Sequence, residues 1–150
     1  MKVSPKHIVL ALTLVIFGGI FFFFYLMYQK DVAALGNFKS SYEKFDQKIS
    51  DLSARGTDDV ARKANEARVE LNANTSFSLS SLIKNDNALP VVALEIADLS
   101  GKELDALDSY TKAMHSKSAN LEALSKAYDD LRNKRKAAYA RFEELAEIKD

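Results

Sequence analysis

The chain has no cysteine and only five glycines among its 150 residues, and both shortages exclude kinds of chemistry. Without cysteine there are no disulfides, no thiolate metal sites and no cysteine nucleophiles. The few glycines form neither a glycine-rich phosphate-binding motif nor a GxSxG nucleophile motif. The sequence therefore has no familiar catalytic signature, and its information lies in how apolar and charged residues are spaced.

Histidine is scarce too, since the chain contains only His7 and His115. A metal site on a helix needs ligands three or four residues apart on one face, and His115 has neither an acid nor a histidine at those distances. Paired acids such as Asp129-Asp130 fall on amphipathic patterns, where a solvated helix face accounts for them better than acid–base catalysis. We predict no catalytic residue, no metal site and no cofactor, and we expect that the protein is not an enzyme.

Charge sums to zero over the whole chain but is unevenly distributed. Residues 1–30 contain Lys2, Lys6 and Lys30 and no acid, whereas residues 31–150 have a small excess of acids. A slightly acidic domain gives no reason to expect nucleic acid as a partner. The basic run RNKRK at 132–136 has no interleaved aromatic residues, so we interpret it as a helix face rather than a binding patch.

A long apolar segment without charged side chains runs from Ile8 to Tyr28. As a helix it would rise about 31 Å, close to the thickness of a bilayer's hydrocarbon core, whereas a cleavable signal has a shorter apolar stretch. We predict a retained transmembrane anchor over 8–28, preceded by a short tail over 1–7. Tyr25, Tyr28 and Lys30 then fall at the membrane interface, where tyrosine rings and lysine ammonium groups are favoured.

The orientation of this anchor follows from lysines on its two sides. Lys2 and Lys6 lie on the short side, while Lys30 is offset locally by Asp31, which favours a cytoplasmic N-terminus. Further lysines beyond the anchor count in the opposite sense and leave the reverse orientation open: Lys39, Lys44 and Lys48. We predict a single-pass protein of the plasma or inner membrane, with its C-terminal domain outside the cytoplasm.

Beyond the anchor the apolar residues recur at helical spacing. The first seam has intervals of three and four residues, as in a coiled coil: Leu35, Phe38, Tyr42, Phe45, Ile49 and Leu52. Gly56 suits the position just after a helix, and a second apolar pattern follows through Ala64 and Leu71. Folding back near residue 56 would place Tyr42 opposite Leu71 and Ile49 opposite Ala64, so we predict an antiparallel helical hairpin.

The remaining sequence predicts two more helices. Ser100 and Glu103 match the S-x-x-E capping box, which predicts a helix start at Gly101. The acid-rich stretch 95–108 and the basic stretch 132–141 would lie side by side if the chain turned near residue 117, with 98 opposite 136 and 103 opposite 131. The predicted helices lie near 31–55, 58–83, 91–116 with a break at 99–101, and 119–148, within a soluble domain over 29–150. Whether residues 72–90 are helix or loop stays open.

These patterns predict an all-α protein: one N-terminal transmembrane helix followed by an antiparallel helical hairpin or four-helix-bundle-like domain. Two functions fit that architecture. The first is a non-catalytic membrane-anchored scaffold or accessory subunit that binds a protein partner, or a second copy of itself, in the cell envelope. The second is a self-contained four-helix bundle that binds a small ligand as a sensor or transport accessory. Oligomeric state separates them, because a first seam left open would self-associate and a closed bundle would be monomeric.

Overall fold

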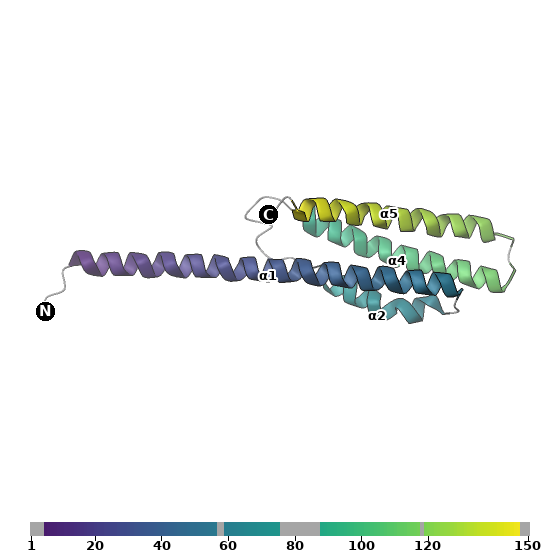
Figure 1. The fold of residues 1–150 in the computed structure, drawn as a ribbon, viewed down its shortest axis with the longest axis horizontal. Helices are drawn as coiled ribbons and strands as arrows, with labels where there is room; N and C mark the ends of the chain where they lie inside the picture. The colour runs from purple at the N-terminus through teal and green to yellow at the C-terminus, as the bar shows by residue number, and fades with distance from the viewer. Residues whose placement is uncertain (1–4, 57–58, 76–87, 118, 148–150) are drawn as a thin grey trace.

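The computed structural model describes residues 5–56, 59–75, 88–117 and 119–147. Within these ranges the protein is helical, with four helices and no strand, as Figure 1 shows. The helices are α1 (Pro5–Arg55), α2 (Val60–Ala73), α4 (Ala88–His115) and α5 (Leu121–Glu147). The all-helical class predicted from the sequence is confirmed for this part of the chain.

Helix α1 is uninterrupted from the apolar segment into the packed part of the protein (Figure 1). The residues between these two parts, Gln29 and Lys30, are good helix formers, so nothing in the local sequence separates them. The helix ends at Arg55, and Gly56 follows with a φ of 55°, a left-handed conformation that glycine adopts without steric cost. This confirms the predicted helix end.

Helices α1 and α2 form the predicted antiparallel pair. The Lys44 ammonium lies 2.6 Å from a Glu70 carboxylate oxygen, and the Asn74 side-chain amide donates a 2.6 Å hydrogen bond to the Ser41 hydroxyl. These contacts agree with the predicted register to within two residues. Helix α2 ends at Ala73, so the described part of the chain shows only the first half of the helix predicted over 58–83. Most of residues 72–90, for which the sequence leaves helix or loop undecided, lies outside the described residues.

The predicted break at 99–101 is wrong, because α4 runs through it from Ala88 to His115. Ser100 does not cap a new helix: its hydroxyl donates a 2.7 Å hydrogen bond to the Ile96 carbonyl one turn earlier. Glu103 is buried and engages α5 instead of folding back to Ser100. A glycine inside a helix costs only about 1 kcal/mol, so packing on both sides of Gly101 overrides the local capping signal.

Helices α4 and α5 lie side by side and are joined by a short connection (Figure 1). Glu103 pairs with Arg135 and Glu95 pairs with Arg141, so the acid-rich and basic stretches meet as predicted. The register differs by two to four residues, since residue 95 faces 141 rather than 139 and residue 103 faces 135 rather than 131. Helix α5 begins at Leu121, later than predicted, which moves the point of reversal along the chain.

All four helices contribute to one apolar core. Its buried members include Phe38, Tyr42, Phe45, Ile49, Leu52, Val60, Ala64, Leu71, Leu89, Val92, Ala93, Ile96, Leu104, Leu107, Tyr128, Ala138 and Phe142. The buried core residues of α1 are all large, whereas α2, α4 and α5 each contribute large residues together with one alanine: Ala64, Ala93 and Ala138. Small residues between large ones let facing helices interdigitate. None of the apolar residues before Asp31 belongs to this core.

Candidate functional site

The N-terminal part of α1 is an exposed apolar rod. Among the described helices, α1 is the one that is long and apolar enough to cross a membrane, and its most apolar window has no side chain buried by the rest of the chain. Signal sequences near an N-terminus meet the same criteria of length and composition. The rod is not a core helix of this chain, since large side chains such as Val15 and Phe21 are 72% exposed.

The three residues predicted at the membrane interface lie on the exposed surface of α1. Tyr25 and Tyr28 are both exposed, and the Gln29 side-chain amide donates a 3.2 Å hydrogen bond to the Tyr25 hydroxyl. Lys30 is exposed one residue further along. Their role at an interface stays a prediction, and their exposure agrees with it because packing within the described chain does not compete for these side chains.

The six residues of the first seam all face the core. Phe38, Tyr42, Phe45, Ile49 and Leu52 are buried, and Leu35 is partly buried against them. Across the core, Phe38 contacts Phe142 of α5 with ring centroids 4.7 Å apart, and Tyr42 stacks on Tyr139 at 3.6 Å. The seam is therefore an internal surface between the helices, and the chain itself provides its partners.

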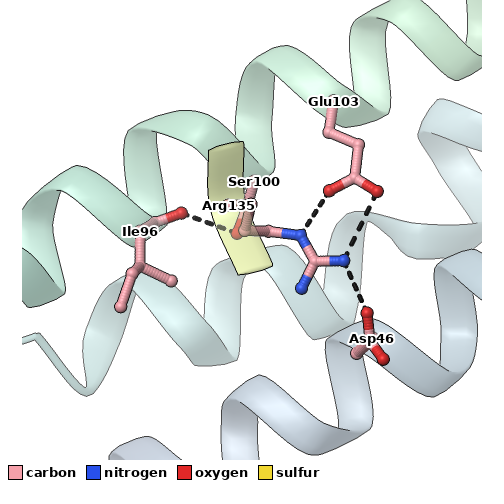
Figure 2. Close-up of polar contacts among 5 residues, drawn as sticks. All are labelled: Asp46, Ile96, Ser100, Glu103 and Arg135. Atoms are coloured by element: carbon pink, nitrogen blue, oxygen red, sulfur yellow. Dashed lines mark hydrogen bonds and ion pairs between the residues drawn. The ribbon is translucent and has the colours of Figure 1, made fainter. Parts of the chain in front are cut away.

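A cluster of charged side chains lies in the middle of this core and joins three helices (Figure 2). Arg135 of α5 donates through its Nε to Glu103 of α4, and its Nη2 lies 3.4 Å from the second Glu103 oxygen. The same Nη2 donates a 2.5 Å hydrogen bond to Asp46 of α1. Arg135 and Glu103 are fully buried, whereas the Asp46 side chain is 33% exposed.

Aromatic rings complete the surroundings of the guanidinium. Its central carbon lies 5.0 Å from the centroid of the Tyr42 ring and 5.4 Å from that of Phe45, which are cation–π distances. Arg135 Nη1 is buried and has no hydrogen-bond partner among the described residues. The rings thus lie close to the guanidinium, while its Nη1 stays without a hydrogen bond among the described residues.

The electrostatics of the cluster keep it charged. Burial alone would lower the pKa of the Arg135 guanidinium, but the hydrogen bond and charge of Glu103, with the hydrogen bond to Asp46, raise it above its ordinary value. Burial raises the pKa of Tyr42 to about 12, against the opposing effect of Arg135. Removing Glu103 or Arg135 would leave the other member of the fully buried pair without its buried counter-charge, which is far more costly than losing an exposed ion pair.

Both carboxylates of the cluster are already occupied. Each carboxylate is engaged by Arg135, so neither is placed as a free base for a substrate. Within the described ranges, no three His, Cys, Asp or Glu side chains are grouped so that they could hold a metal ion. The arrangement joins α1, α4 and α5 through one guanidinium, whose planar fork favours a defined placement of its acceptors, so we propose that it helps to align these helices.

Sequence reasoning misses this cluster although both buried partners carry a signal. Arg135 occupies a position in the α5 seam whose neighbours in that seam, Leu131 and Ala138, are both apolar. A cation at such a position either pairs with a buried acid or extends its side chain so that the charged end contacts water. Glu103 also fits a capping box. Because the capping box already accounts for this acid, the sequence does not identify Glu103 as the buried partner of Arg135.

A shallow open groove between α1 and α2 is the other notable surface. It is lined by Lys44, Lys48, Lys63, Glu66, Ala67 and Glu70. Lys44 and Glu70 already pair across it, so the groove mixes both signs of charge and favours neither anions nor cations.

No protein-family model, curated protein or solved structure matches this chain. Its function must therefore be inferred from its own residues.

Proposed function

We propose that the protein is a non-catalytic, membrane-anchored helical scaffold or accessory subunit that holds a protein partner in the cell envelope. The observation that carries this proposal is the continuity of α1, whose exposed apolar part leads without a break into the core. A helix that is apolar on all sides and unpacked in its own chain is stable in lipid or against another protein, and is costly in water.

In this proposal residues 8–28 span the plasma or inner membrane once, and the helical domain lies outside the cytoplasm. The lysines at the short N-terminal end support that orientation. Because α1 continues without a hinge, the domain is held at a fixed angle to the anchor, as a scaffold requires. A flexible linker would instead leave a domain free to reorient.

The same proposal describes the domain as a closed antiparallel bundle of four helices. The burial of the seam residues Phe38 and Phe45 supports closure, and it changes where a partner would bind. The partner surface is then an outer face of the domain or the anchor itself, rather than the seam.

The closed seam supports the small-ligand alternative in one respect, because a self-contained bundle needs no partner to bury its seam residues. A ligand site would need space among polar groups near the middle of the bundle. There, Tyr42 and Phe45 cover the Arg135 guanidinium, and the carboxylates are occupied. This filling makes the scaffold the better-supported function.

The test is purification of the tagged full-length chain from its own membrane in mild detergent, with mass spectrometry of associated proteins. A companion present in stoichiometric amount is the expected result. A matched variant with residues 8–28 replaced by an unrelated apolar span shows whether the anchor or the helical domain recognises it. Purification of both chains alone and monodisperse would contradict the scaffold and favour ligand screening of the bundle.

A further inference from the structure

Beyond the proposed span, the described chain exposes few large apolar side chains. They are Val32 on α1, Val69 on α2, and Val91 and Leu94 on α4. Val91 and Leu94 are neighbours on one face of α4 and are 59% and 57% exposed. Isolated exposed valines are ordinary, but a pair at the start of a helix that is otherwise charged on its outer face calls for a reason.

The position of this pair along the molecule follows from contacts between helices. Glu95 of α4 pairs with Arg141 of α5, and the next residue, Phe142, packs on Phe38 of α1. Glu95 and Phe38 therefore lie at about the same height above the membrane. Further along, Glu103 and Asp46 meet at Arg135, so α4 runs in the same direction as α1 and begins nearest the membrane (Figures 1 and 2).

These heights place the first turns of α4 close to the bilayer surface. Val91 precedes Glu95 by one turn and Leu94 precedes it by one residue. At about 1.5 Å per residue they lie about 9 Å and about 13 Å beyond Tyr28, the last residue of the proposed span, so the lean of the side chains and the tilt of the helix must bring them down to the headgroups. A headgroup layer extends about 5–8 Å beyond the hydrocarbon core. Side chains on a helix lean toward its N-terminus, which for α4 is toward the membrane, and membrane helices tilt by about 20° on average.

The outer face of α4 changes character with height. Nearest the membrane it carries Val91 and Leu94, and its first turn contains no acid. Further along the same face the exposed residues are charged or polar: Asp98, Lys102, Asp105, Ser109 and Lys112. An apolar start followed by a charged continuation is the pattern of a surface that meets lipid at one end and water at the other.

We propose that the domain rests on the membrane, with Val91 and Leu94 inserted among the lipid headgroups. This contact depends on the proposed anchor, because it is α1 that brings the start of α4 to the bilayer. It fixes the tilt of α1 toward the α4 side and so gives the domain one defined orientation on the membrane. The outer faces of α2 and α5, which do not contact lipid in this arrangement, then remain accessible to a partner.

The chain contains no tryptophan, so single-tryptophan variants can report contact with lipid. The probe is the full-length chain in phosphatidylcholine vesicles that carry a nitroxide quencher high on the acyl chain. Val91→Trp and Leu94→Trp are compared with Val69→Trp, which replaces a similarly exposed valine far from the membrane, and with Phe24→Trp inside the proposed span.

We expect lipid quenching and a blue-shifted emission for Val91→Trp, Leu94→Trp and Phe24→Trp, and neither for Val69→Trp. Quenching of Phe24→Trp alone would overturn the resting contact and leave the anchor intact. A blue shift of Val91→Trp without lipid quenching would also overturn it, because protein would then cover this surface. If Phe24→Trp is not quenched either, the anchor itself fails, and the contact fails with it.

Discussion

The two halves of α1 are both rich in apolar side chains but have opposite environments. From Ile8 to Tyr28 the apolar residues occupy every side of the helix and are exposed. From Leu35 to Leu52 they recur at three and four residues and are buried against α2, α4 and α5. The comparison teaches that the period of the apolar residues, rather than their number, decides whether a helix packs within its own chain.

The second half also differs in carrying charge into the core. Asp46 lies on α1 one residue beyond Phe45 and reaches Arg135, whereas the span has no charged side chain at all. In lipid an unpaired charge would be expensive, and in the domain the charge is tolerated because Arg135 neutralises it. In the proposed membrane arrangement one continuous helix meets two solvents, and its sequence changes character within about two turns.

The largest expected difference between the halves comes from truncating one phenylalanine in each. Phe45→Ala removes a fully buried ring, leaves a cavity and uncovers the Arg135 guanidinium, and should destabilise the domain by about 4 kcal/mol. Phe24→Ala changes an exposed side chain of the span and should leave the stability of the domain unaltered. Urea unfolding of the full-length chain in detergent micelles, followed by circular dichroism, measures both.

Equal destabilisation by the two substitutions would contradict the division of α1 into a packed half and a span. Phe45→Leu provides a milder control, because it keeps most of the apolar volume and should recover much of the loss.

A somewhat smaller effect is expected from breaking the charge cluster. Glu103→Ala leaves a buried guanidinium with only the partly exposed Asp46 as a partner, and should cost about 3 kcal/mol. Thermal unfolding of the full-length chain by circular dichroism detects this as a lower midpoint.

The matched control removes the charges together. A chain with Glu103→Leu and Arg135→Met loses the buried pair, and Asp46 can turn toward water, so its stability should lie within about 1 kcal/mol of the original. If the single and double variants are equally unstable, shape rather than charge accounts for the loss, and the proposed role of the cluster in aligning the helices is wrong.

The comparison also explains how far the sequence predicts the structure. Periodic apolar residues from Leu35 to Leu52, the glycine at 56 and the small residues of α2 predict the first hairpin and its register, because these signals agree with one another. The predicted break at 99–101 is wrong because the capping box at Ser100 is a local signal. The burial of Glu103 by another helix is a tertiary effect that such a signal does not contain.

The charge cluster could not be predicted from the sequence for a related reason. The acid-rich and basic stretches predict that α4 and α5 meet, and they do. Which pair becomes buried depends on the register, and a shift of about one turn decides whether Arg135 faces Glu103. That shift follows from where the connection places Leu121, which periodicity alone does not determine.

The smallest predicted effect is the pH dependence that Tyr42 contributes from the packed half of α1. Burial raises the pKa of Tyr42 to about 12, above its ordinary value near 10, so the folded state favours the neutral phenol. Stability from this group is fully present below pH 10 and is lost as the pH rises toward 12. Since a tenfold change in acid dissociation corresponds to about 1.4 kcal/mol, the loss at pH 12 is about 2 kcal/mol.

Urea unfolding at several pH values between 9 and 12 measures this loss, and Tyr42→Phe is the matched control because it keeps the ring stacked on Tyr139 and over Arg135 without an ionisable hydroxyl. The variant should lose less stability over this range than the original chain. The difference isolates Tyr42 from the lysines and from Tyr139, whose pKa burial also raises. Identical curves for the two chains would mean that the Tyr42 hydroxyl reaches water, and that the packed half of α1 is less tightly closed around Arg135 than its ring contacts indicate.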